Sequence, residues 1–82
     1  MNESVDWREA LYIKSFDEEL RGLERRKEFD PNLTIEDLEK VLQGLYIIER
    51  VEGRGEVVDI SMAAGIAAHE HFIAQWKADK EE

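Results

Sequence analysis

The chain has 82 residues, of which 43% are apolar and 38% are charged, and this length suits one small domain rather than two separately buried cores. Its 20 acidic and 11 basic side chains leave a net charge of −9. That balance disfavours sites for nucleic acid or for an anionic membrane surface, because both attract clustered Lys and Arg. The absence of cysteine excludes disulfides, thiolate metal sites and a cysteine nucleophile.

Two features of the sequence predict the compartment. The longest stretch of low charge, Ile60 to His69, is shorter than the roughly 20 apolar residues that span a membrane. The first residues, Met-Asn-Glu-Ser-Val-Asp, lack the basic start and apolar run of a secretion signal. We therefore expect a cytoplasmic protein that is not associated with a membrane.

Strong turn signals occur at only two places, Asp30-Pro31-Asn32 and Gly53-Arg54-Gly55. The three segments that they separate carry apolar residues at spacings of three and four, which predicts helices. We expect an all-α fold, a single domain over residues 1–82. Its architecture is predicted to be a three-helix, up-down-up antiparallel bundle that is completed by dimerisation.

The first helix is predicted over about residues 5–28. Its expected core stripe lies within about 100° of the helix circumference. The members of this stripe are Val5, Tyr12, Ile13, Phe16, Leu20 and Leu23. Trp7 and Leu11 project from the opposite side, where a simple three-helix bundle would be polar.

The second helix is predicted over about residues 35–52, with Thr34 and Asp37 as a capping box at its start. Leu33 and Leu38 are placed to pack together across this cap, and Gly53 is expected to end the helix. The apolar stripe consists of Ile35, Leu38, Val41, Leu42, Leu45, Tyr46 and Ile48, extended sideways by Ile47 and Val51.

The third helix is predicted over about residues 58–78, with Asp59 as a candidate N-cap. Glu56 to Asp59 also fit a short extended stretch. One side carries Val58, Met62, Gly65, Ile66, His69, Phe72, Ile73 and Trp76, and the other carries Ile60, Ala63, Ala64, Ala67 and Ala68. A helix that is apolar almost all round is buried, and two neighbours hardly cover it.

The only histidines, His69 and His71, are two residues apart. On a helix they point about 160° apart, so they cannot chelate one metal ion together. The His spacing of a zinc helix and the Glu-x-x-His pair are both missing. We expect no metal, no cofactor and no catalytic residue.

Three polar residues are predicted to be buried: His69, Glu49 and Tyr12. His69 lies within an apolar stripe, which favours a hydrogen-bonded core or interface histidine over a pH-sensitive switch or an exposed phosphate acceptor. Glu49 lies on the core side of the second helix. If the first two helices are antiparallel, Tyr12 lies at its level and can donate its hydroxyl proton.

Each predicted helix contains one glycine, and each glycine costs about 1 kcal/mol relative to alanine. Close helix approach explains Gly65, a bend is one interpretation of Gly22, and Gly44 has either a packing role or none. The basic run Glu24-Arg25-Arg26-Lys27 complements the dipole of the first helix. The alternative for this run is a docking site for an acidic partner or a second copy of the chain.

The surplus of apolar residues is the strongest pointer to function. The candidates for a partner interface are Trp7, Leu11, Ile47, Val51, Ile60 and Ala64. Monomers rarely expose large apolar patches, so we expect a protein-protein interaction or self-assembly module, as a homodimer or with a protein partner, and infer no small-molecule ligand. One alternative is an acidic, antitoxin-like inhibitor that binds a basic surface. The other is a metal- or histidine-dependent enzyme subunit using His69, His71, Glu70, Glu49 and Tyr12.

Overall fold

The computed structural model describes residues 6–51 and 55–81. It contains helices α1 (Trp7–Phe29), α2 (Ile35–Glu49) and α3 (Glu56–Lys80). The predicted all-helical class with three helices is confirmed. The extended alternative for Glu56 to Asp59 is wrong, because these residues form the first turn of α3. The predicted start of the first helix at Val5 lies outside the described residues, as does Gly53. The predicted end of the second helix near residue 52 is wrong, because α2 ends at Glu49 and Arg50 caps it.

The start of α2 is fixed by the capping box that the sequence predicts. The Thr34 hydroxyl accepts the Asp37 amide proton, and the Asp37 carboxylate accepts the Thr34 amide proton, both over 3.1 Å. Two of the amides that a helix start leaves unpaired are thereby satisfied. A similar cap that the sequence analysis missed starts α1, where Asp6 accepts the amide proton of Arg8 over 3.0 Å.

Helix α3 begins differently, because a glycine rather than a polar side chain precedes it. Gly55 has a φ of 98°, a backbone conformation that a Cβ atom would strain. Asp59, the candidate N-cap, is instead inside the first turn, where its amide donates to the Gly55 carbonyl oxygen over 3.0 Å. The glycine in the predicted turn therefore sets the start of the helix.

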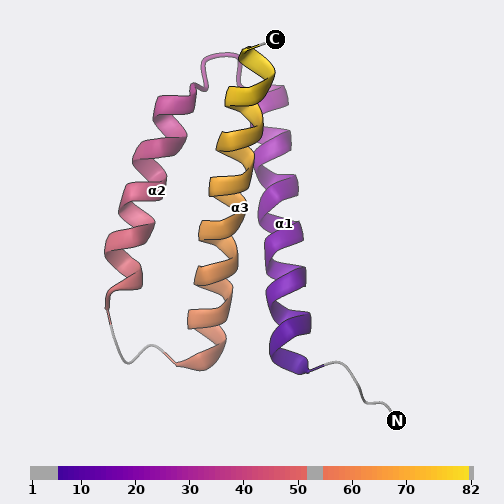
Figure 1. Cartoon of the computed structure of the whole chain (residues 1–82), viewed down its shortest axis with the longest axis vertical. Helices are drawn as coiled ribbons and strands as arrows, with labels where there is room; N and C mark the ends of the chain where they lie inside the picture. Colours follow the sequence, from indigo (N-terminus) through magenta and orange to yellow (C-terminus); the bar gives the residue numbers. More distant parts are fainter. Residues whose placement is uncertain (1–5, 52–54, 82) are drawn as a thin grey trace.

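Helix α3 is the shared neighbour of the other two helices (Figure 1). Both α1 and α2 pack closely against α3, whereas the described parts of α1 and α2 make no close backbone contact with each other. The expectation that the third helix is central and needs more than two neighbours rests on its apolar circumference. The structure supplies two neighbours, so the gap between α1 and α2 stays open along one side of α3.

Contacts between α1 and α3 follow the same order along both helices. Near the two helix starts, Arg8 donates a hydrogen bond to the carboxylate of Glu56. Near the two helix ends, the Lys27 ammonium lies 4.7 Å from the centre of the Trp76 ring. The hydrocarbon and charge of Lys27 thus cover an aromatic face at the end of the bundle.

Contacts between α2 and α3 occur in the opposite order. Tyr46, late in α2, donates its hydroxyl proton to Glu70. Glu39, early in α2, pairs with the Lys77 ammonium over 2.8 Å. Lys77 lies about two turns after Glu70 in α3. Both polar contacts are exposed at the edge of the α2–α3 interface.

The buried core lies around the ends of α1 and α3 and the start of α2. Its members are Leu23, Leu33, Leu38, Leu42, Ile66, Phe72 and Ile73. Leu38 is the largest side chain that is fully buried. At the other end of the molecule, apolar side chains such as Trp7, Ile48 and Val57 are exposed. In the described residues, no helix combines the length and apolar content that crossing a bilayer demands.

The face of α1 that packs on α3 differs from the predicted one in the first half of the helix, whereas Leu20 and Leu23 belong to the core as predicted. Ile13 is 58% exposed and Tyr12 is also exposed, although both were predicted in the core stripe. Leu11 and Ser15 are half-buried instead, and the Ser15 hydroxyl lies 3.4 Å from that of Ser61 on α3. The side of α3 that α1 covers carries small residues, and this permits a small polar contact where the apolar pattern predicted large side chains.

Candidate functional site

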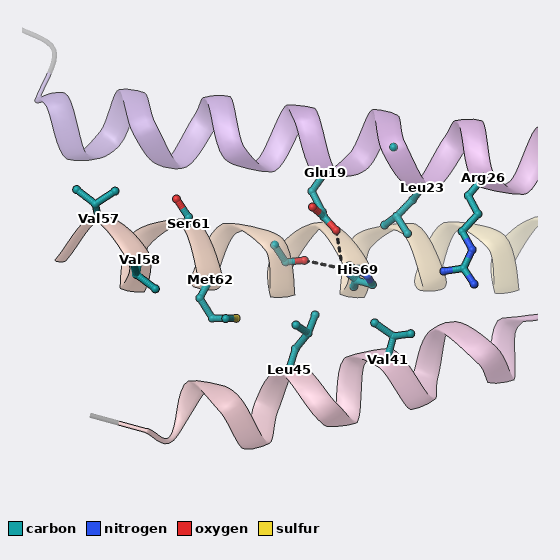
Figure 2. A pocket seen from close by; sticks show the side chains of 12 residues that line it. Glu19, Leu23, Arg26, Val41, Leu45, Val57, Val58, Ser61, Met62 and His69 are labelled. Carbon is teal, nitrogen blue, oxygen red and sulfur yellow. Dashed lines mark hydrogen bonds and ion pairs between the residues drawn. The ribbon is translucent and has the colours of Figure 1, made fainter. Parts of the chain in front are cut away.

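A groove of about 610 Å³ lies between α1 and α2, with α3 as its floor (Figure 2). It exists because α1 and α2 each pack on α3 and stay apart from each other. The apolar lining consists of Leu23, Val41, Leu45, Val57, Val58 and Met62. On α3 the groove extends from Val57 to His69, a distance of about 18 Å at the helical rise. Its length therefore matches about three turns of a helix.

His69 is the polar side chain in the floor of the groove. It is only 4% exposed, and its Nδ1 atom lies 2.8 Å from the carbonyl oxygen of Gly65. Because a carbonyl only accepts, Nδ1 carries the proton, and Nε2 of the neutral ring is an acceptor. Within the part of the chain that the structure describes, Nε2 forms no hydrogen bond. A nearly buried acceptor therefore faces no donor of its own chain.

Two opposite charges lie on the α1 wall of the groove. Glu19 and Arg26 both line it, about 10.5 Å apart along the helix. The Glu19 carboxylate is 3.8 Å from Nδ1 of His69 and has no Lys or Arg partner among the described residues. Arg26 forms no ion pair there either, and its side chain extends into the groove in Figure 2. The wall thus presents one unmatched anion and one unmatched cation.

Two of the three glycines within helices line the groove. A Cβ atom added to Gly22 or Gly65 would meet nothing within 4 Å, and the same holds for Gly44, which does not line the groove. No helix of this chain therefore approaches Gly65 closely enough to account for it. Gly22 and Gly65 leave open space next to the groove, at positions where alanine would favour the helix.

The predicted partner interface is only partly exposed. Trp7, Ile47 and Val51 are exposed, and Leu11 and Ile60 are half-buried. Ala64 is fully buried within this chain, so its assignment to a partner surface is wrong. The physical reason is that α1 packs along this part of α3, where the Ser15 hydroxyl meets that of Ser61 and the Phe16 ring lies 6.0 Å from that of His71. None of these six residues lines the groove.

The predicted pair of Tyr12 and Glu49 is also wrong as a buried contact. Both residues are exposed, and they lie on α1 and α2, which do not approach each other closely. The tyrosine with a carboxylate partner is Tyr46 instead, which donates to Glu70. This hydrogen bond raises the pKa of Tyr46 above its ordinary value. Sequence periodicity placed Tyr46 in the core stripe and gave no signal for this contact.

The second histidine, His71, does not line the groove. His71 is exposed on another side of α3 from His69, with its ring 6.0 Å from that of Phe16. Among residues 6–51 and 55–81, no three His, Asp or Glu side chains lie together as a metal site requires. Comparison with protein-family models, curated proteins and solved structures found no match to this chain.

Proposed function

We propose that this chain is a protein-protein interaction module without catalytic activity and that its groove receives a helix from the protein to which it binds. The observation that carries the proposal is the apolar groove between two helices that share α3 but do not contact each other. Exposed apolar surface of this kind is typical of interaction sites. The order of the helix contacts supports an up-down-up course, which a docked helix would complete as a four-helix bundle.

The groove suits a helix in both length and lining. Its floor of about 18 Å corresponds to about 12 helical residues. A helix that binds in such a groove uses apolar side chains at spacings of three and four, which would contact Val41 and Leu45 on one wall and Leu23 on the other. Helices that pack together have axes about 8–10 Å apart, so small residues on the floor favour close docking.

The acidic-inhibitor alternative has less support. Its argument is the net charge of −9, which would attract a basic surface. The groove, however, is lined mainly by apolar side chains, and the charges on its α1 wall are one Glu and one Arg. Burial of apolar surface is therefore the better account of binding at this site.

A selection experiment tests the groove as a helix-binding site. A phage library of amphipathic 12-residue helices is selected on the parent chain, and the selected peptides are measured on Gly65→Leu, which fills the groove floor. Gly44→Leu is the matched control, because Gly44 also lies in open space but does not line the groove. We expect binding to the parent and to Gly44→Leu, and loss of binding to Gly65→Leu.

Two results would contradict this proposal. One is a selection that yields no helical peptide above background. The other is a set of peptides that bind Gly65→Leu as tightly as they bind the parent, with circular dichroism showing that both proteins are equally helical.

A further inference from the structure

We propose that the helix received by the groove is α1 of a second copy of this chain, antiparallel to the first α1. This inference rests on the proposed function of the groove and names its partner. In the arrangement, the two copies face each other across a two-fold axis near Gly22 and Leu23, and each copy places the last turns of α1, up to Phe29, over the His69 end of the groove of the other. A two-fold interface requires a self-complementary surface, which the α1 wall provides.

The charges on the α1 wall are self-complementary in the antiparallel direction. A two-fold axis between Gly22 and Leu23 exchanges position 19 with position 26. Glu19 of each copy then faces Arg26 of the other. Neither residue pairs with an opposite permanent charge among the described residues of its own chain. The interface therefore matches two anions with two cations and leaves no charge on the wall unpaired.

The glycines provide the space that such an approach needs. Gly22 lies beside the two-fold axis and Gly65 lies on the groove floor one turn before His69, and both have open space where a Cβ atom would be. Glycine in a helix interior is unfavourable relative to alanine. No atom of this chain crowds the Cβ position of Gly22 or Gly65, so the reason for these glycines lies outside the chain. A second backbone passing close to Gly22 and Gly65 supplies that reason.

His69 gives an independent indication of what the occupant carries. Its Nε2 atom is an acceptor on a side chain that is nearly buried, and it has no donor within the described chain. Glu19 lies beside the same ring, 3.8 Å from Nδ1. A guanidinium group has five N–H donors, so Arg26 of the second copy, once it faces Glu19, has further donors available for Nε2. The Arg26 side chain of the second copy would thus pair with Glu19 and donate a hydrogen bond to Nε2 of His69.

Exposed apolar residues of α1 lie on the same face of the helix as Glu19 and Arg26. Heptad spacing places Tyr12, Glu19 and Arg26 on one line and Ser15, Gly22 and Phe29 on the neighbouring line. Phe29 is 75% exposed in a single chain, the highest value among the large apolar residues described. Docking of α1 against a second copy would cover the later residues on these two lines, including Phe29. The same face of α1 therefore lines one groove and enters the other.

A charge-exchange series tests the proposed pairing. The dissociation constant of the dimer is measured by sedimentation equilibrium for the parent, Glu19→Arg, Arg26→Glu and the double variant. Each single variant places like charges opposite each other twice, and we expect it to weaken the dimer about tenfold or more. The double variant restores opposite charges, and we expect it to dimerise like the parent.

The matched control is the double variant Glu18→Arg with Arg25→Glu. These residues have the same seven-residue spacing and the same charge change, but they are exposed and do not line the groove. We expect dimerisation of this control to match that of the parent. Glu19→Gln, which keeps the size of the side chain, and Arg26→Gln, which removes the charge, give a second test, in which each variant weakens the dimer.

The possible results separate the partner from the function of the groove. A double variant as weak as the single variants, with unchanged helicity, overturns the antiparallel pairing. A parent that stays monomeric at every concentration, while selected helical peptides still bind the groove, overturns the second copy as partner and leaves the proposed function standing. A dimer that persists in Gly65→Leu, with no peptide selected, overturns both proposals.

Discussion

The imidazole of His69 donates its Nδ1 proton to the carbonyl oxygen of Gly65, one turn earlier in α3 and 2.8 Å away. This bond fixes the ring in the floor of the groove and makes Nε2 of the neutral ring an acceptor. The glycine that provides the carbonyl also lines the groove and leaves it open. Gly65 therefore keeps the floor open, and His69 places a nearly buried hydrogen-bond acceptor, Nε2, in it.

His69→Phe tests whether the ring nitrogens serve association rather than folding. Phenylalanine keeps a ring of similar size and removes both nitrogens. We expect the free energy of unfolding of the monomer to change by about 1 kcal/mol or less, because the bond to Gly65 is a single hydrogen bond. The dimer should weaken about tenfold through loss of a charge-assisted bond. Urea denaturation and sedimentation measure the two quantities, and an unchanged dissociation constant would argue against the role of Nε2.

Leu38→Ala tests where the core lies. Leu38 is fully buried, so its truncation removes apolar contacts and leaves a cavity. We expect a loss of about 2–5 kcal/mol in the free energy of unfolding, measured in urea. Val41→Ala is the control on the same helix, because Val41 is 40% exposed and borders the groove. Equal losses for the two variants would contradict a core in which Leu38 is fully buried and Val41 is not.

The Tyr46–Glu70 contact predicts a dependence of stability on alkaline pH. Its hydrogen bond raises the pKa of Tyr46 in the folded state above the ordinary value of about 10. The folded state therefore holds this proton more tightly than the unfolded state does. The contribution is complete below pH 10 and is lost as the pH rises through the raised pKa.

Thermal unfolding between pH 8 and about pH 11 measures this contribution. We expect the midpoint of the parent to fall more steeply than that of Tyr46→Phe, which lacks the titrating hydroxyl. Parallel curves for the two proteins would show that the contact with Glu70 does not stabilise the fold.

Salt distinguishes a second copy from a basic partner. Two chains of charge −9 repel each other at long range, and salt screens this repulsion more than it screens close pairs such as Glu19 with Arg26. We expect the dimer to tighten as salt rises to about 0.15 M. Sedimentation at several salt concentrations measures the effect. A dimer that weakens steadily over this range would indicate that attraction between exposed charges dominates.

The sequence was sufficient to predict local structure. Three- and four-residue apolar spacing predicts the three helices, and Thr34 with Asp37 predicts the cap of α2, because both signals depend on residues close together in the chain. Which face of a helix is covered depends instead on its neighbour. Ile13 and Leu11 exchanged their expected exposure because α1 packs on the small residues of α3.

The groove was beyond prediction from the sequence for a related reason. Val41 and Leu45 belong to an ordinary apolar stripe of α2, and nothing local shows that α1 stays away from them. Ala64 was assigned to a partner because the back of α3 is apolar, yet it is fully buried within this chain. The helical glycines were the one visible signal, since Gly65 had been attributed to close helix approach and Gly22 to a bend before the structure placed both beside the groove.

The measurement that tests the central claim most directly is native mass by light scattering over a range of protein concentrations. The parent is compared with Gly65→Leu, which fills the groove, and with Gly44→Leu, which lies outside it. The account predicts twice the mass of one chain for the parent and for Gly44→Leu, and the mass of one chain for Gly65→Leu. A parent with the mass of one chain at every concentration, or a Gly65→Leu variant as dimeric as the parent, would contradict it.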